Sequence, residues 1–504
     1  MGWLRNLAGT FVVSRGRCRN QDSRHHPGTA ARIEKVKIPA LLLFIAIATA
    51  APAASKLNVL LLVADDLRAE LGCLGDRQII SPNIDRLANR GRLFTRAYCQ
   101  QAVCNPSRAS FMSGLRPDTI QVWDLKASFR KLFPQHQTLP QLFKDNGYDT
   151  RCIGKIYHNT GNLGDPVSWS KPAVHHEGPH WADTVTAQRK NLKKKAGVPA
   201  VERFEVDDTA YWDGHIARKA AAALGELKDK PFFLAVGFWR PHLPFVAPQK
   251  YWDLYNPRDL PMPTSWFPPE NCPPIALHDS REMRGYGGVP KLPLTPKSTR
   301  HLRHGYYASI TFMDRQIGLV MDALERNGLR DNTIVIFVSD HGFHLAEHGL
   351  WCKTSCFEFD ARVPMIISTP NMKQAGMPSQ SLAELIDLYP TLAELAGLQA
   401  PVVLDGTSLV PILNDPGASV KTAAFTQHPR PAYSREPAPV MGVSIRSNSA
   451  RYTEWRNRET GEIQAREFYD HRTDAQETRN AVGLKSKQSE IRKLATLLAE
   501  QFPR

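Results

Sequence analysis

A continuous apolar run, residues 56–64 (KLNVLLLVA), ends abruptly in Asp65 and Asp66. Such a run is typical of a strand buried on both faces of a parallel sheet, with the acidic pair at its carboxyl end. Similar strand-like runs occupy residues 93–98, 148–153, 231–237, 333–339 and 364–368. Between them the pattern predicts helices over 81–91, 138–146 and 308–327. This alternation predicts an α/β fold, in which helices flank a large mixed, mostly parallel central sheet.

Two segments break the alternation. Residues 159–205 contain His, Trp and Lys and resemble a loop, and residues 253–300 are rich in proline. Long loops of this kind often shape a substrate site. Beyond 427 the pattern changes to short antiparallel strands at 440–446, 450–456 and 465–470, followed by a helix over 486–501. We therefore expect a main domain over 56–427 and a smaller α+β subdomain over 428–504.

Residues 1–55 have the pattern of a leader. Residues 38–55 (IPALLLFIAIATAAPAAS) form a short apolar run after Lys35 and Lys37 and end in small residues, which indicates a secretory signal peptide at about 36–54 rather than a membrane span. Cleavage after Ala50 or Ala54 would leave no integral membrane span. The chain is then expected to be secreted or periplasmic, or lysosomal in a eukaryote. Residues 1–35 lack periodicity, and translation starting at Val36 is one explanation.

The net charge and the cysteine content further limit the class of partner and the chemistry that we expect for this protein. The chain of 504 residues has a formal net charge of +15, and removing the leader leaves about +9. Such a surface suits a polyanion, either a nucleic acid or a sulfated polysaccharide. No zinc-finger spacing or recognition-helix pattern supports nucleic acid. The eight cysteines are scattered without a paired module, so export permits disulfides but the spacing does not give their connectivity.

Chemistry-bearing residues follow several predicted strands. Asp340 and His341 come after the run 333–339, as Asp65 and Asp66 come after 56–64. Carboxylates placed together favour a hard cation such as Ca²⁺ or Mg²⁺, although either pair alone is more often a solvated loop carboxylate or a helix cap. Other candidate residues just beyond strands or in the loop after 341 are Lys155, His158, His242 and Lys353. Alone, each of these would more often be solvated or structural.

Residues 341–349 (HGFHLAEHG) also permit a zinc site. His344 and His348 lie four residues apart and could share a helix face. The order differs from H-E-x-x-H, however, because Glu347 stands on the wrong side of the pair.

The segment Cys104-Asn105-Pro106-Ser107-Arg108 carries the most specific pattern. Proline and the residues behind it predict the first turns of a helix. Residue 104 would then lie at the helix N-terminus, where free amides and the helix dipole favour an anion. A lone cysteine in such a place is otherwise a small apolar filler.

Together these motifs resemble the iduronate-2-sulfatase-like branch of the sulfatase family, in the alkaline phosphatase superfamily. The resemblance spans about 57–475 and rests on these stretches: ADD (64–66), QQAVCNPSR (100–108), LRPDT (115–119), GKIYH (154–158), FFLAVGFWRPHLPF (232–245), SDHGFHLAEHGLWCK (339–353) and RYTEW (451–455). Ser113 in place of the usual Thr, and Cys352 within the last long motif, are minor departures. His341 follows the pattern of this branch, where many other sulfatases have Asn.

The resemblance implies an alkaline-phosphatase-like sandwich and a sulfuric ester hydrolase. It implies that a formylglycine-generating or other sulfatase-maturing enzyme converts Cys104 to formylglycine (3-oxoalanine), whose hydrate attacks sulfur. One Ca²⁺ would be held by Asp65, Asp66, residue 104, Asp340 and His341. The implied catalytic residues are Cys104, Arg108, Lys155, His158, His242 and Lys353.

In that scheme Arg108 hydrogen-bonds the hydrate, while Lys155, His242 and Lys353 offset charge on the sulfate. His242 or Lys353 protonates the leaving oxygen, and His158 takes a proton when sulfate is released.

The implied substrate is a sulfated carbohydrate, such as an O-sulfated uronate of an anionic polysaccharide. Two alternatives stay open: a phosphomonoesterase or phosphodiesterase of the same superfamily, and a non-catalytic protein that binds sulfated glycans.

Overall fold

The computed structural model describes residues 56–503, apart from 159–163, 176–179, 183–197, 288, 290–291, 402 and 434–437. The predicted leader and signal peptide therefore lie outside the described residues, as does much of the 159–205 segment. Within the described ranges, every helix is too short or too polar to cross a lipid bilayer.

A seven-stranded sheet forms the centre of the molecule, in the order β11-β2-β10-β7-β1-β5-β3. Its strands are β1 (Asn58–Asp65), β2 (Arg92–Tyr98), β3 (Asp149–Gly154), β5 (Phe232–Pro241), β7 (Thr333–Ser339), β10 (Arg362–Ser368) and β11 (Ser379–Glu384). Strand β10 runs antiparallel to both of its neighbours, and the other pairings are parallel. The sheet is therefore mixed and mostly parallel, as the apolar runs predict.

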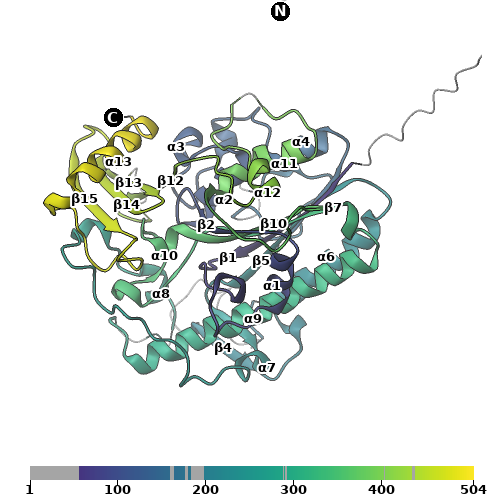
Figure 1. The fold of residues 1–504 in the computed structure, drawn as a ribbon. Coiled ribbons are helices and arrows are strands. Elements are labelled where there is room, and N and C mark those ends of the chain that lie inside the picture. The colour runs from purple at the N-terminus through teal and green to yellow at the C-terminus, as the bar shows by residue number, and fades with distance from the viewer. Residues whose placement is uncertain are drawn as a thin grey trace, which may run out of the picture. The chain divides into compact units, whose positions relative to one another are not determined.

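Helices cover both faces of this sheet (Figure 1). One face carries α1 (Pro82–Asn89), α6 (Trp212–Leu227) and α9 (Pro296–Arg326), and the other carries α2 (Cys104–Ser113), α4 (Leu139–Asp145), α11 (Leu388–Leu395) and α12 (Val410–Asn414). Strand β1 serves both layers because its side chains alternate between the faces. Leu60 and Leu62 pack in the first layer, whereas Leu61 and Val63 pack in the second. Burial on both faces explains why the strand is apolar throughout.

The shorter elements lie in the connections between these layers. They are α3 (Pro117–Ile120), β4 (Val201–Phe204), β6 (Phe245–Pro248), α7 (Gln249–Trp252), α8 (Arg281–Arg284), β8 (His344–Leu345), β9 (Trp351–Cys352) and α10 (Glu358–Ala361).

A smaller antiparallel sheet follows, in the order β12-β13-β14-β15, with a closing helix α13. Its elements are β12 (Ala423–Arg430), β13 (Val440–Ser447), β14 (Ala450–Asn457), β15 (Ile463–Asp470) and α13 (Gln488–Gln501). The last three strands and the helix confirm the predicted C-terminal elements. The expected domain boundary at 427/428 falls inside β12, and residues 54–504 form one compact unit. The division into two domains stays a prediction.

Strand β12 attaches the small sheet to the segment that leads into α2. The Gln427 amide donates to the Gln100 carbonyl at 2.8 Å, and the Thr426 hydroxyl donates to the Cys99 carbonyl at 2.7 Å. The small sheet is thus held within a few residues of Cys104.

Helix α9 and strand β11 are among the elements that differ from the sequence prediction. Helix α9 begins at Pro296, not at 308, so the end of the 253–300 segment is helical. Its start is fixed by Thr295, whose hydroxyl accepts from the Ser298 amide at 3.2 Å, and by proline at the first helical position. Strand β11 was not predicted, because SQSLAE is too polar to form an apolar run. It pairs in parallel with β2 at the edge of the sheet.

Candidate active site

Four adjacent strands, in the order β7-β1-β5-β3, run parallel and end at one edge of the sheet. Their carboxyl ends supply predicted site residues: Asp65 and Asp66 from β1, Asp340 and His341 after β7, Lys155 after β3, and His242 after β5. Functional groups gather at this edge in open α/β sheets. The sheet order therefore brings together residues that lie up to 276 positions apart in the chain.

The position of Lys155 depends on a close approach between β3 and β5. Its amide donates to the Gly237 carbonyl at 2.8 Å. A Cβ atom at position 237 would lie 1.9 Å from the Lys155 carbonyl oxygen, so only glycine fits there. This contact fixes the backbone from which Lys155 reaches the site.

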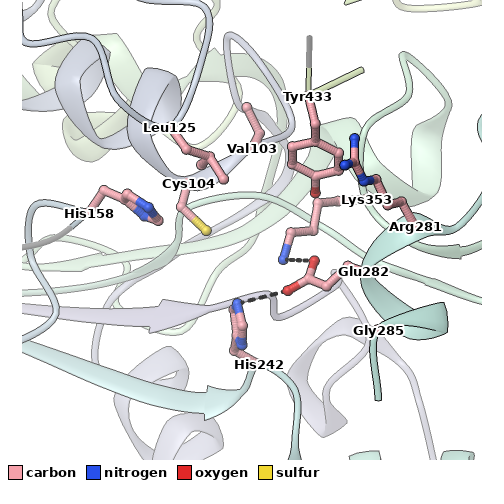
Figure 2. Close-up of a pocket in the computed structure, with 10 residues that line it drawn as sticks. All are labelled: Val103, Cys104, Leu125, His158, His242, Arg281, Glu282, Gly285, Lys353 and Tyr433. Carbon is pink, nitrogen blue, oxygen red and sulfur yellow. Dashed lines mark ion pairs between the residues drawn. The ribbon is translucent and has the colours of Figure 1, made fainter. Parts of the chain in front are cut away.

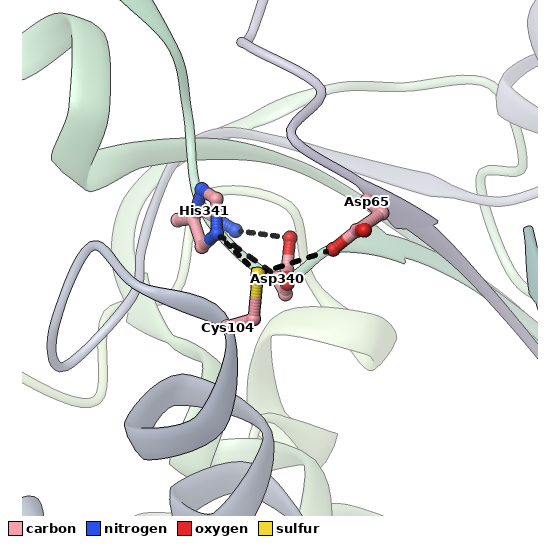
Figure 3. Close-up of side chains that lie close together, drawn as sticks. All are labelled: Asp65, Cys104, Asp340 and His341. Carbon is pink, nitrogen blue, oxygen red and sulfur yellow. Dashed lines mark hydrogen bonds and ion pairs between the residues drawn. The ribbon is translucent and has the colours of Figure 1, made fainter. Parts of the chain in front are cut away.

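Cys104 is the first residue of α2, as predicted, and is 2% exposed. Its Sγ lies 3.5 Å from Asp65 Oδ1 and 3.4 Å from His341 Nε2 (Figure 3). Lys155 Nζ lies 3.5 Å from the same sulfur. Burial raises the pKa of the Cys104 thiol well above its ordinary value, and the Asp65 carboxylate adds to the effect. The unmodified thiol is therefore protonated and a poor nucleophile at neutral pH.

Arg108 joins the two carboxylates on either side of Cys104. Its Nη2 donates to Asp65 Oδ1 at 2.9 Å and its Nε donates to Asp340 Oδ2 at 2.8 Å, with all three side chains fully buried. Lys155 Nζ donates to the other oxygen of Asp65. Burial alone would raise the pKa of Asp65, but Lys155 and Arg108 outweigh it and hold the pKa well below its usual range. Asp65 is therefore ionised.

Two overlapping groups of side chains could hold a metal ion. Ligand atoms of Asp65, Cys104, Asp340 and His341 all lie within 4.8 Å of one another, and so do those of Asp65, Asp66, Cys104 and His242. Together the two groups contain all five predicted metal ligands and also His242.

The His341 ring is oriented for ligation. Its Nδ1 lies 2.9 Å from the Gly342 carbonyl, which can only accept, so Nδ1 carries the proton. The lone pair of Nε2 then faces Asp66 Oδ1 at 3.4 Å and Asp340 Oδ2 at 3.5 Å. Holding the tautomer through the second ring nitrogen is common among histidine ligands of metals. The donor set fits a divalent cation.

Glu282 also lies in this site, although no sequence motif marks it. Glu282 Oε2 lies 2.6 Å from Lys353 Nζ, and Glu282 Oε1 lies 3.2 Å from His242 Nε2 (Figure 2). Lys353 Nζ also lies 2.8 Å from Asp66 Oδ2. Burial would raise the pKa of Glu282, but Lys353 and His242 hold it well below its usual range. A carboxylate thus pairs with Lys353 and His242, two of the three residues predicted to offset charge on the sulfate.

A cavity of about 320 Å³ opens onto these groups. Its lining comprises Val103, Cys104, Leu125, His158, His242, Arg281, Glu282, Gly285, Lys353 and Tyr433. His158 and the two predicted proton donors, His242 and Lys353, therefore line the same cavity as Cys104. Burial, aided by the positive charge of Lys155, lowers the pKa of His158 to about 2. His158 is neutral at physiological pH, and its buried Nδ1 has no hydrogen-bond partner among the described residues.

The alternative zinc segment does not form a helix. His344 lies in β8 and His348 has a left-handed backbone with a φ of 57°. His344 contacts Asp360 Oδ1 through Nδ1 at 2.6 Å and His348 Nδ1 through Nε2 at 3.3 Å. Glu347 is bound by Arg68 and Arg303. His344 does group with His278 and Asp360 as a second candidate set of metal ligands, but without the helical arrangement.

The seven cysteines within the described part of the chain, which include Cys104, are all free thiols.

Comparisons with known proteins agree with the site. The sequence matches the family model for sulfatases over residues 57–398, and the model for the C-terminal part of N-sulphoglucosamine sulphohydrolase over residues 346–502. Mouse iduronate 2-sulfatase is 35% identical over 470 residues, which cover 80% of this chain and 85% of that protein.

Two solved structures share the fold. BT4656 in complex with its substrate D-glucosamine-2-N,6-O-disulfate has a TM-score of 0.72 and 23% identity, over 88% of this chain and 97% of that one. A phosphonate monoester hydrolase of Agrobacterium radiobacter has a TM-score of 0.72 and 22% identity, over 88% and 95%. Because hydrolases of different esters share this fold, fold alone does not choose between them.

Proposed function

This chain belongs to the sulfatase family and is a sulfuric ester hydrolase, and from that membership we propose that it removes O-sulfate groups from a sulfated carbohydrate through formylglycine at position 104 and one bound Ca²⁺. The observation that carries the proposal is the position of Cys104 Sγ. It lies within 3.5 Å of Asp65, Lys155 and His341, at the cavity that also holds Lys353 and His242.

Modification of Cys104 supplies what the thiol lacks. The hydrate of formylglycine would provide the attacking oxygen and would release sulfate afterwards by re-forming the aldehyde. The motif Cys-x-Pro-Ser-Arg and the raised thiol pKa both support this conversion. A sulfatase-maturing enzyme is then an obligatory partner before the chain becomes active.

Asp65, Asp66, Asp340, His341 and residue 104 would hold the cation. When bound, Ca²⁺ would polarise the sulfate oxygens and favour ionisation of the attacking group. Three carboxylates suit a hard ion, whereas an imidazole is a less usual ligand for calcium.

The surrounding side chains perform the remaining tasks. Arg108 fixes the two carboxylates on either side of residue 104. Lys155 and Lys353 place positive charge where negative charge develops on the sulfate. His242 Nδ1 lies 2.5 Å from the Leu243 carbonyl and Nε2 faces Glu282, so the ring can donate from both nitrogens only when it is protonated.

Proton transfer then has two candidate donors and one acceptor. His242 or Lys353 would protonate the leaving oxygen, since both line the cavity beside Cys104. His158 would accept the proton released as sulfate leaves, because its ring is neutral and its Nδ1 is unpartnered.

A sulfated carbohydrate, including an O-sulfated uronate, is the substrate class that the charge and the relatives support. The net charge of about +9 beyond residue 55 attracts a polyanion over long range. The signal-peptide pattern would place the enzyme outside the cytoplasm, in a secreted, periplasmic or lysosomal setting where such polymers occur. Mouse iduronate 2-sulfatase is named for such a sugar.

Two measurements test the proposal together. Peptide mass spectrometry should show that residue 104 has lost the thiol mass. A desulfation panel should then show turnover of heparin or dermatan disaccharides or algal sulfated oligosaccharides above choline sulfate and an aryl sulfate. Better turnover of the small esters would overturn the carbohydrate assignment.

The same panel separates the alternatives. Phosphomonoester or phosphodiester hydrolysis exceeding sulfate release would favour the phosphatase alternative. Glycan binding without turnover by a fully modified protein would favour a non-catalytic lectin-like role.

A further inference from the structure

A second cavity, of about 190 Å³, adjoins the reaction cavity. The two share Val103, Leu125, Arg281 and Tyr433, which Figure 2 shows on the side of the reaction cavity opposite His242. The second cavity is further lined by Trp123, Asp124, Lys126, His428 and Pro429. A substrate larger than a single sulfated sugar would therefore pass from one hollow into the other.

The cations of this second cavity are available to a ligand. Arg281 and Lys126 are both exposed, and neither side chain makes an ion pair or hydrogen bond within the described part of the chain. The Asp124 carboxylate is engaged by its own turn, where Oδ1 accepts the amides of Lys126 and Ala127 at 2.7 Å. The cavity lining therefore carries two cationic side chains, Lys126 and Arg281, against the single carboxylate of Asp124.

An aromatic surface accompanies these cations. Trp123 is half-buried, and its Nε1 donates to Asp118 Oδ1 at 2.6 Å. Arg458 stacks over its ring, with 4.2 Å between the guanidinium carbon and the ring centroid. A fixed indole beside these cations suits an anionic sugar, whose C–H groups contact the part of the ring that lines the cavity while its acid group meets the charge.

The loop of residues 123–127, which contributes to the second cavity, is hydrogen-bonded to the segment that contains Cys104. Asn105 Nδ2 donates to the carbonyls of Asp124 and Ala127, each at 2.8 Å, and Gln101 Nε2 donates to the Trp123 carbonyl at 2.8 Å. Asn105 follows Cys104 directly in sequence. The distance from the reacting residue to the second cavity is thus set by side chains of the same segment, without an intervening hinge.

We infer that this second cavity is a subsite for the sugar linked to the sulfated one, and that Lys126 and Arg281 bind a carboxylate or sulfate group on that second sugar. The inference rests on the proposed carbohydrate sulfatase function and makes it more specific. The enzyme would act on an anionic disaccharide or longer chain in preference to an isolated sulfated sugar. Specificity for the second sugar would come from residues 123–126 and from Arg281, whereas sulfate is held by the residues around Cys104.

The test compares kcat/KM for two matched substrates that carry the same sulfated sugar. One is a uronate-containing sulfated disaccharide, and the other is the same disaccharide with its second-sugar carboxylate reduced to an alcohol. The wild-type enzyme should prefer the acidic form by roughly 5- to 30-fold, as expected for one charge-assisted contact. Lys126→Gln should lower that ratio by roughly 3- to 10-fold, mainly through KM.

Lys131→Gln is the matched control, because Lys131 is an exposed lysine a few residues away that lines neither cavity. It should leave the ratio at the wild-type value. Equal turnover of both disaccharides by wild type, with no effect of Lys126→Gln, would overturn the subsite and leave the carbohydrate proposal standing. Turnover of an aryl sulfate with neither disaccharide hydrolysed would overturn both.

Discussion

Lys353 Nζ lies 2.6 Å from Glu282 Oε2. A carboxylate from the proline-rich 253–300 segment therefore forms an ion pair with a lysine of the proposed sulfate site. Asp66 Oδ2 lies on the same ammonium at 2.8 Å. A bound sulfate ester would have to share Lys353 with Glu282, and like charges in a buried site repel.

Glu282→Gln should therefore tighten binding of inorganic sulfate. Removing the charge of Glu282 removes one competitor of the anion for Lys353 and His242, and we expect the inhibition constant for sulfate to fall by about 10-fold, or ~1.4 kcal/mol. Steady-state inhibition with an aryl sulfate substrate measures it. Asp279→Asn is the control, because Asp279 lies in the same segment but is exposed and pairs with Arg284. An unchanged or weaker inhibition constant in Glu282→Gln would show that Glu282 does not compete with sulfate.

Arg108 is expected to be required for both folding and activity. It bridges Asp65 and Asp340, and its Nη1 also donates to the carbonyl of Ile156 at 3.0 Å. Arg108→Gln should lower the free energy of unfolding by about 3–5 kcal/mol, because two buried carboxylates lose their ion pair with the guanidinium. It should also lower kcat by at least about 100-fold. Urea unfolding and aryl sulfate turnover measure the two effects.

Arg116→Gln separates the loss of stability from the loss of activity. Arg116 forms a buried pair with Glu384 at 2.8 Å, outside the active-site cavity. This variant should also lose stability but keep its turnover per folded molecule. Equal losses of kcat in both variants would contradict a specific role for Arg108.

Calcium should stabilise the folded protein through the carboxylates at the strand ends. A ligand that binds only the folded state at 100 times its Kd adds about 2.7 kcal/mol, so Ca²⁺ should raise the midpoint of thermal unfolding after chelator treatment. Asp340→Asn should abolish that rise. Asp360→Asn should retain it, because Asp360 belongs to the separate group with His278 and His344. If zinc raised the midpoint of thermal unfolding and only Asp360→Asn abolished that rise, the result would instead support a zinc site at His278, His344 and Asp360.

Two of the strands that position the site, β1 and β7, could be predicted because each is an apolar run that ends in a polar residue. Strands β1 and β7 are buried along their whole length, so their composition alone marks them. Their pairing as parallel neighbours, which brings the ends that bear Asp65 and Asp340 together, is seen only in the structure. Roles in catalysis for these residues stay predictions.

Glu282 could not be predicted, because its function depends on where an irregular segment folds back. Nothing in HDSREMRG (278–285) distinguishes Glu282 from Asp279, yet one is inside the cavity and the other is exposed to solvent. Tyr433 and Arg281 were missed for the same reason. Local sequence carries periodicity and capping signals, whereas these positions are set by tertiary contacts.

Acid should destabilise the protein in part through His348. Its ring is 1% exposed and lies between Phe357 and Phe359, at centroid distances of 4.8 and 5.7 Å. Burial, with the neighbouring His344 ring, lowers the pKa of His348 to about 4. An unfolded histidine has a pKa near 6.5. Below about pH 6.5, His348 therefore binds a proton in the unfolded chain but not in the folded chain. The free energy of unfolding falls as the pH is lowered to about 4.

His348→Gln should make the protein less sensitive to acid. Glutamine can still donate to the Gln476 carbonyl, which His348 Nε2 contacts at 2.8 Å, but it does not titrate. Between pH 7.5 and 5.0 the loss in free energy of unfolding should be smaller by about 1–2 kcal/mol, from 1.36 kcal/mol per pH unit below 6.5. Urea unfolding at both pH values measures this. His215→Gln, at a half-exposed position on α6, should show the wild-type loss, and an equal loss in all three proteins would mean that His348 is protonated without cost in the folded state.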